Sequence, residues 1–420
     1  MHEKSAVGLL LALLVASAGA QSSVTLFGQE YTVQRFHYFS NVSWDWNGQD
    51  VPLHSVEGVV WLGNDRLLLS TEEADQNGLL PLVPENAVVE VRLPRDPNTG
   101  LVTGLFFERL VLTQDETFFF LGGWGLNPSG ITINSSASGL AAGGNLVVAD
   151  TESDDGTFSS LRGYDLASGQ QFAWPPGSNC LSINNGKFCE MSLEPHNPDV
   201  EDVVYVAQTD RFYTIADNIY RVVTFTTDGT YLPAESFDVP LFGFGETKGI
   251  AFVPNNGKFP TAISDGIGAF LISQDDVGPA IQARTISGQL LAFEPLTTNG
   301  LPSRPPKLDV PDGGLLQIEA LTVDPATGRI FLINQGQDDL LGDYLWVLTP
   351  VTPAVCPGDT DCDGDVDFDD IDPFIALIGC PGGAGCDGPC AWQSADVDQD
   401  GDVDFDDIDP FVTVLGSVCP

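Results

Sequence analysis

Positive charge is what this chain has least of. Its 420 residues include 16 Lys and Arg against 59 Asp and Glu, which gives a formal net charge of −43 at pH 7. Such a surface repels polyanions, so nucleic acid and anionic membrane surfaces are excluded as partners. The shortage of basic side chains also argues against a highly phosphorylated substrate. Cations are the partners that this composition favours.

Histidine and the common catalytic motifs are equally scarce. The four His residues are too few to favour a histidine-based triad or a zinc hydrolase. The sequence has no G-x-S-x-G elbow, no P-loop and no dinucleotide fingerprint. No local motif therefore indicates a catalytic class.

Long apolar segments are absent beyond the N-terminus. Residues 1–20 have the pattern of a secretory signal, with Lys4, an apolar stretch over residues 6–15 and small residues at 18–20. The stretch is too short to span a bilayer, and no later segment qualifies. We therefore expect a bacterial protein that is exported, secreted or held at the cell surface, and not transmembrane. The sequence indicates no oligomeric state.

Eight cysteines fit an exported protein, in which such clusters usually form disulfides. Cys180 and Cys189 would close a hairpin-sized loop, and Cys356 and Cys419 would clasp the two ends of the C-terminal segment. Four further cysteines leave three pairings open: Cys362, Cys380, Cys386 and Cys390. A zinc site is the rival interpretation of that cluster, although its spacing is irregular and the segment contains no His.

The chain is rich in turn formers, with 45 Gly and 29 Pro between aromatic and β-branched runs, which predicts an all-β protein. A four-stranded unit recurs along residues 21–350 at intervals of 58–72 residues, which is typical of a β-propeller. We predict five to six blades, in which residues 23–46 complete a sixth blade or close the ring with the last unit. The first strands of the units begin at Glu57, Ser129, Glu190, Lys248 and Glu319.

Polar residues open each first strand and close each second strand, so we expect them to meet on one rim of the central channel. The predicted second strands include residues 203–208 and 260–265. The main candidates for a channel site are Glu57, Asp150, Glu190, Lys248, Asp265 and Glu319. The same rim would also gather Glu72, Glu73, Asp210 and Asn334.

A ring of carboxylates can hold one Ca²⁺ or another hard cation, and a metal-activated water there could hydrolyse an ester. The alternative is that these polar strand ends only face solvent. Lys248 argues against a purely metal-holding ring, because it could pair with a neighbouring Glu instead.

Four segments of the body resemble the esterase-like, phytase-like propeller family and, more loosely, the gluconolactonase-like and NHL propellers. They are residues 56–59, 127–131, 248–253 and 318–324. The resemblance implies a metal-dependent ester or phosphoester hydrolase. Because no constellation of residues demands catalysis, a propeller that binds a ligand or metal in its channel is the interpretation that we prefer.

The C-terminal segment carries the strongest chemical signal. The same eleven letters occupy residues 364–374 and 401–411, and each copy follows an Asp-rich run. Together they form two twelve-residue D-x-D-x-D-G-x-x-D-x-x-D loops, the spacing of an EF-hand calcium loop, with Gly364 and Gly401 at the turn. The predicted ligands of two Ca²⁺ ions are Asp359, Asp361, Asp363, Asp365, Asp367 and Asp370 in the first loop, and Asp396, Asp398, Asp400, Asp402, Asp404 and Asp407 in the second.

The alternative for this segment is an acidic, disordered tail. Residues 351–420 contain seventeen Asp and no Glu, Lys or Arg, so self-repulsion should unfold the module when no cation is bound. Two gap-free loops in register favour a folded calcium form. In that form we expect Val366 and Val403 to pair the two loops by a short strand contact.

These loops resemble type I dockerin modules and, more closely, the cysteine-flanked dockerin-like tails of secreted planctomycete-type proteins. The resemblance implies a small α-helical module that ligates calcium and attaches the protein to a cohesin-like receptor or a surface partner. Pro373 and Pro410 depart from that pattern, so we expect Asp372 and Asp409 to cap the helices with proline at the first helical position. The acidic residues at the recognition positions weigh against an ordinary cohesin. The predicted organisation is a signal peptide at 1–20, a propeller at 21–350 and the calcium module at 356–420.

Overall fold

The computed structural model describes two compact units, residues 1–350 and residues 351–420. Within them it describes residues 22–351 and 356–419 with internal gaps. The gaps are 47–48, 54, 72–85, 98, 115–127, 136–144, 152–158, 173–179, 184–187, 194–195, 197–199, 217–218, 242–245, 275–278, 297–307, 309–315, 335–343, 383–385, 387, 389 and 391. The predicted signal segment lies outside the described residues. Within the described part, no helix is both long enough and apolar enough to cross a membrane.

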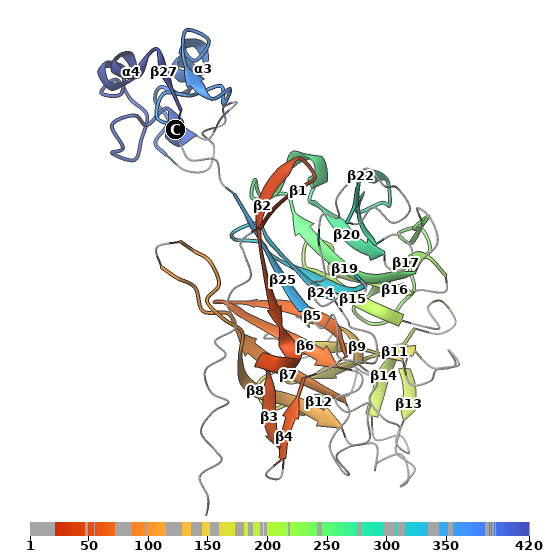
Figure 1. Ribbon diagram of the computed structural model, residues 1–420. Coiled ribbons are helices and arrows are strands. Elements are labelled where there is room, and N and C mark those ends of the chain that lie inside the picture. The colour runs from red at the N-terminus through yellow and green to blue at the C-terminus, as the bar shows by residue number, and fades with distance from the viewer. Residues whose placement is uncertain are drawn as a thin grey trace, which may run out of the picture. The chain divides into compact units, whose positions relative to one another are not determined.

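The body is a five-bladed β-propeller (Figure 1). The first blade contains β5 (Val56–Gly63), β6 (Arg66–Thr71), β7 (Asn86–Arg92) and β8 (Phe106–Gln114). The second contains β9 (Pro128–Asn134), β10 (Asn145–Thr151), β11 (Ser159–Tyr164), β12 (Gln171–Phe172), β13 (Cys180–Ile183) and β14 (Phe188–Ser192). The third contains β15 (Val200–Val206), β16 (Arg211–Ala216), β17 (Arg221–Thr226) and β18 (Phe237–Asp238). The fourth contains β19 (Thr247–Pro254), β20 (Gly268–Gln274), β21 (Ala280–Thr285) and β22 (Leu290–Pro295).

The fifth blade is completed by the N-terminal strands. Its order is β1-β2-β25-β24-β23, so that β2 (Gln29–His37) pairs with β25 (Tyr344–Pro350). Residues near the N-terminus therefore close the ring with the last unit and do not build a sixth blade. The remaining strands of this blade are β1 (Ser22–Leu26), β23 (Ile318–Asp324) and β24 (Arg329–Asn334). The helix α1 (Tyr38–Asn41) and the hairpin of β3 (Ser43–Trp46) and β4 (Gln49–Pro52) lead from this blade to the first.

The first strands of the five blades form the inner ring, in which β5, β9, β15, β19 and β23 each contact the inner strands of both neighbouring blades. Glycine permits this close approach. A Cβ atom on Gly58 would lie 2.6 Å from the carbonyl oxygen of Ser129, and one on Gly130 would lie 2.4 Å from Cα of Asp202. The inner strands could not pack at these distances with larger residues.

Apolar clusters between neighbouring blades hold the body together. One joins the first and second blades around Leu68 and Val148, and another joins the second and third around Leu161 and Phe212. The three others lie between the third and fourth, the fourth and fifth, and the fifth and first blades. Each blade therefore buries both faces of its sheet, one against each neighbouring blade.

Two of the predicted blades contain a wrongly assigned strand. The inner strand of the third blade is β15, not the segment at Glu190, which lies in β14 on the outer side of the second blade. In the fourth blade, residues 260–265 form a connection with a 3₁₀ turn, η2 (Thr261–Ile263), and the second strand is β20. The error in the third blade arose because apolar runs of similar length occur at inner and outer positions of a blade.

The C-terminal unit has two repeats, each a loop followed by a short helix: α3 (Ile371–Leu377) and α4 (Ile408–Val414). The helices begin directly after the loops, with Asp370 and Asp407 at the N-cap positions, so the predicted caps at Asp372 and Asp409 are wrong. Each helix proline is therefore its third residue, where a missing N–H costs little because the first turn has no intrahelical acceptors. A 3₁₀ turn, η3 (Trp392–Ser394), precedes the second loop.

Each repeat makes its short strand contact with the other repeat. β26 (Asp365–Val366) in the first loop pairs with β27 (Ser417–Val418), which follows the second helix. Val403 in the second loop bridges Cys380, which follows the first helix. The prediction that Val366 and Val403 pair with each other is therefore wrong. Instead, each loop pairs with the exit of the other repeat's helix.

Candidate functional site

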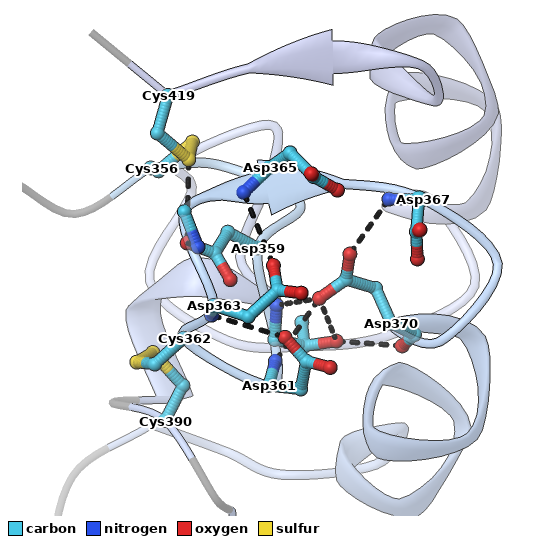
Figure 2. The surroundings of a disulfide bond; sticks show 12 residues. Cys356, Asp359, Asp361, Cys362, Asp363, Asp365, Asp367, Asp370, Cys390 and Cys419 are labelled. Carbon is cyan, nitrogen blue, oxygen red and sulfur yellow. Dashed lines mark hydrogen bonds between the residues drawn. A yellow bond between two sulfur atoms is a disulfide. The ribbon is translucent and has the colours of Figure 1, made fainter.

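The first acidic loop gathers three carboxylates around one point (Figure 2). Oxygen atoms of Asp359, Asp361 and Asp370 all lie within 4.8 Å of one another. Asp359 and Asp370 are buried, with 7 % and 1 % of their surface exposed. Ionised carboxylates at this separation repel one another. No Lys or Arg occurs from residue 351 to the C-terminus to offset that repulsion.

Asp370 organises the first loop through both of its carboxylate oxygens. Oδ1 accepts hydrogen bonds from the backbone N–H groups of Thr360 (2.5 Å) and Asp361 (3.0 Å), and Oδ2 accepts one from Asp367 (2.8 Å). A carboxylate held from both ends of a loop is in the position where a calcium loop places its last ligand. Although Asp370 is at the N-cap position, its side chain makes no capping hydrogen bond to the helix.

The second loop repeats this geometry. Asp396, Asp398 and Asp407 form a second cluster within 4.8 Å, and Asp407 is 1 % exposed. Its Oδ1 accepts from Val397 (2.7 Å) and Asp398 (3.1 Å), and its Oδ2 accepts from Asp404 (2.9 Å). The local sequence alone therefore builds both loops in the same way.

The remaining predicted ligands hold the turns of their own loops. In the first loop the N–H of Asp365 donates to Asp363 at 3.2 Å, and the N–H of Asp369 donates to Asp367 at 2.7 Å. In the second loop Asp400 accepts from Asp402 at 3.3 Å and Asp404 accepts from Asp406 at 2.7 Å. Asp363, Asp367, Asp400 and Asp404 are exposed, whereas Asp365 and Asp402 are half-buried.

The donor set fits a hard cation. Oδ1 of Asp359 is buried and accepts no hydrogen bond, so one oxygen of the cluster has no protein partner. The pKa of Asp361 is raised, first by partial removal from water and then by the negative charges of Asp363 and Asp370. The pKa of Asp365 is raised chiefly by the charge of Asp363. Carboxylate oxygens in such number and at such proximity are the ligands that Ca²⁺ prefers.

Three disulfides fasten the module. Cys356–Cys419 clasps its ends as predicted, and the open pairing is resolved as Cys362–Cys390 and Cys380–Cys386. The zinc interpretation is therefore wrong for these cysteines. The sulfur of Cys419 lies 3.2 Å from Oδ2 of Asp359, but a disulfide sulfur has no proton to donate and no thiolate to offer a metal. The side chains of Cys180 and Cys189 lie outside the described residues.

In the propeller, five β-bulges occur at the same place in the inner strands. At each bulge the Cα register skips one or two residues of the inner strand, and bulges of this kind redirect side chains at a rim. The first skipped residue of each strand belongs to a set that we call the charged ring, in which Ser129 alone is uncharged: Glu57, Ser129, Glu201, Lys248 and Glu319. Three of the six predicted channel residues belong to this ring, namely Glu57, Lys248 and Glu319.

Lys248 is paired within the ring. Its Nζ lies 3.3 Å from a carboxylate oxygen of Glu201 and 3.5 Å from one of Glu246. The predicted pairing of Lys248 with a neighbouring Glu is therefore confirmed. Among the described side chains, no cluster capable of holding a metal includes a residue of the charged ring.

Asp150 lies at the same rim, at the end of β10, but its carboxylate is already paired with a basic side chain. Its Oδ2 lies 2.5 Å from Arg162 Nη2, and both side chains are almost completely buried. A buried pair of this kind neutralises its own charge. Asp150 therefore ties β10 to β11 and offers no free charge to a channel ion.

The other predicted rim residues lie elsewhere. Asp265 is exposed in the connection that leads into β20, and Asp210 lies in the turn between β15 and β16, both at the far ends of inner strands. Glu190 belongs to β14 on the outer side of a blade, and its side chain is not described. Placing these three residues on the rim was therefore wrong. Glu72 and Glu73 lie outside the described residues.

Two residues of the inner ring were missed, Glu201 and Asp202. Asp202 is fully enclosed where three inner strands meet, and its carboxylate accepts N–H bonds from Val203 and Ile250, both at 2.8 Å. Burial raises the pKa of Asp202 well above its usual range. The signal that could have found it is the spacing, since Glu201 lies 72 residues after Ser129, just as Ser129 lies 72 after Glu57.

Comparisons with known proteins found similarity among solved structures alone. No family model matches the chain, and no curated protein matches it. Among solved structures, a putative exo-β-1,3-galactanase from Bifidobacterium bifidum s17 is 12% identical with a TM-score of 0.43, covering 76% of this chain and 93% of that one. A periplasmic gluconolactonase from Pseudomonas aeruginosa is 12% identical with a TM-score of 0.37, covering 80% and 79%. Similarity this low indicates nothing about what this chain binds or catalyses.

Proposed function

We propose that this is an exported calcium-binding protein whose dockerin-like tail attaches a β-propeller body to a surface or extracellular partner. The observation that carries the proposal is the twin set of carboxylates. Each loop brings three Asp side chains together within 4.8 Å in a segment without a single basic residue. Two Ca²⁺ ions would be held by the Asp residues of the two loops and would neutralise them.

Two exposed phenylalanines support attachment. Phe368 and Phe405 occupy the same position in the two loops and are 81 % and 75 % exposed. Large apolar side chains exposed in this way, surrounded by acidic residues, mark contact surfaces for a protein partner. An acidic partner is unfavourable for electrostatic reasons, so we expect the receptor surface to combine an apolar pocket with basic residues.

The test separates calcium binding from attachment. Isothermal titration of the full chain should show two calcium ions bound, and Phe368→Ser with Phe405→Ser should leave that stoichiometry unchanged. The same double variant should lose retention on the surface of the producing cells, as measured by fractionation against the wild type. Retention of the double variant at wild-type levels would contradict attachment through these residues, and failure to bind calcium would contradict the proposal as a whole.

A metal-dependent ester or phosphoester hydrolase is the second candidate function. It rests on Glu57, Glu201 and Glu319 at equivalent bulges of the inner strands, although Lys248 pairs with Glu201 and no metal-holding cluster among the described side chains includes these residues. A panel of ester and phosphoester substrates, with and without calcium, should show turnover that Glu57→Ala abolishes. Absence of turnover across the panel would leave the propeller as a binding unit.

A further inference from the structure

The two ends of the propeller channel differ in chemistry. Four residues beyond each member of the charged ring, the same inner strands carry a second set of residues, which we call the apolar ring. Its members are Trp61, Ile133, Tyr205, Phe252 and Val323. Charge at one mouth is thus replaced by apolar and aromatic side chains toward the other.

A cavity of about 370 Å³ opens among the apolar ring and is lined by all five inner strands. None of the described residues that line it is Asp, Glu, Lys, Arg or His, although the chain carries 59 acidic residues. This volume is at the small end of the range for pockets that bind organic ligands. A charged ligand would lose its hydration there and find no countercharge among these lining residues.

The aromatic side chains of the cavity are held in place from behind. Trp61 stacks on Phe331 with ring centroids 5.1 Å apart, and the hydroxyl of Tyr205 donates to Asp210 Oδ1 at 2.8 Å. Because these rings are already fixed, a ligand that stacks on them would bind with little loss of side-chain conformational entropy.

Polar atoms at the cavity are few and specific. Oγ1 of Thr132 accepts the N–H of Tyr205 at 3.1 Å, and Oγ1 of Thr322 accepts the N–H of Trp61 at 3.2 Å. A hydroxyl that accepts still has its own proton to donate. Gln208 adds an exposed amide at the same mouth.

From these features we infer that the cavity at the apolar ring binds a small, uncharged, planar organic molecule that carries a carbonyl or hydroxyl group. The flat face stacks on the aromatic side chains, and the oxygen accepts a hydrogen bond from a threonine hydroxyl. This inference rests on the preferred interpretation of the propeller as a unit that binds a ligand in its channel, and it specifies the class of that ligand. It does not depend on calcium in the tail.

The experiment uses Prodan, a neutral naphthyl ketone whose emission shifts to the blue in apolar surroundings. Titration of the full chain with calcium present should give a saturable blue shift at one site. Ala207→Trp, which fills the mouth from an exposed lining position, should weaken binding by about tenfold or more, or about 1.4 kcal/mol. Ala262→Trp, an equal change at an exposed position of η2 outside the cavity lining, should bind as the wild type does.

Three results would overturn the inference: no saturable shift, equal affinity in both tryptophan variants, or a shift that disappears on chelation of calcium. The last would place the probe on the tail. A tail that fails to bind calcium while Prodan still binds to the cavity would contradict the attachment proposal alone. The two failures are therefore distinguishable.

Discussion

The propeller body and the C-terminal module are stabilised by different forces. The body buries apolar side chains in five clusters between its blades. The module has one small cluster, centred on Val366, Phe374 and Phe411, and surrounds it with seventeen Asp residues from 351 to 420. Apolar burial is enough for a large unit but marginal for a segment of this size, which generally needs disulfides or metals. Stability should therefore depend on solution conditions in the tail far more than in the body.

Chelation of calcium should produce the largest effect. Excess chelator should unfold residues 356–420, because their carboxylates lose the only charge that balances them, and should leave the propeller folded. Hydrogen exchange on the full chain measures both units at once. Protection of Val366 and Phe411 amides that survives chelation would contradict calcium-dependent folding, and loss of protection in β6 or β24 would contradict independence of the body.

Removal of the clasp between Cys356 and Cys419 should come next. The bond joins residues 63 apart, and closing a loop of this length stabilises the folded state by about 4 kcal/mol in the chain-entropy description. In the double Cys→Ser variant, folding of the tail should have its midpoint at a higher calcium concentration than in the wild type. The unfolding transition of the body should not shift. Cys380→Ser with Cys386→Ser is the matched control, because its loop spans only 6 residues and its loss should cost less.

Asp370→Asn should distinguish the two loops. The amide cannot replace a carboxylate that accepts three backbone N–H bonds and also faces the cluster, so we expect a cost of about 2 kcal/mol at the first site. Calcium titration should show one site weakened and the other retained. Asp369→Asn, next to it in the same loop and exposed, removes the same charge and should leave both sites intact; equal weakening by both variants would mean that net charge alone binds the ion.

Asp202 should give the body a smaller dependence on pH. Its pKa is raised in the folded state by burial, so the folded state holds the proton more tightly than the unfolded state does. The stabilising contribution is fully present below the ordinary aspartate pKa and is lost as pH rises through the raised one. Urea unfolding followed by tryptophan fluorescence, with calcium in excess, should therefore show stability falling between acid and neutral pH.

Asp202→Asn should remove that slope while adding a cost that is independent of pH, because one backbone N–H then faces an amide NH₂. Asp238→Asn, at an exposed position, should keep the wild-type slope. If the slope persists unchanged in Asp202→Asn, another group is responsible for it.

The acidic loops could be predicted because their information is local. Twelve consecutive residues supply every predicted calcium ligand from Asp359 to Asp370, and spacing along the chain is enough to bring three of these carboxylates together. The disulfide between Cys356 and Cys419 followed from the same logic, since two cysteines bracket one compact repeat pair. The channel was predicted less well. The position of a strand within a blade depends on pairing with strands far away in the chain, which its own sequence does not identify.

The sequence by itself therefore determined the all-β body, its propeller periodicity, the twin acidic loops and the clasp of the tail. Only the tertiary structure decided that the ring has five blades, that Glu201 and not Glu190 joins the charged ring, and that Asp202 is enclosed between three strands. It also decided that each acidic loop pairs with the exit of the other repeat's helix. The physical reason is the range of the interactions: ligand spacing and strand alternation act over a few residues, whereas blade closure and inner-strand packing depend on contacts between residues far apart in the chain.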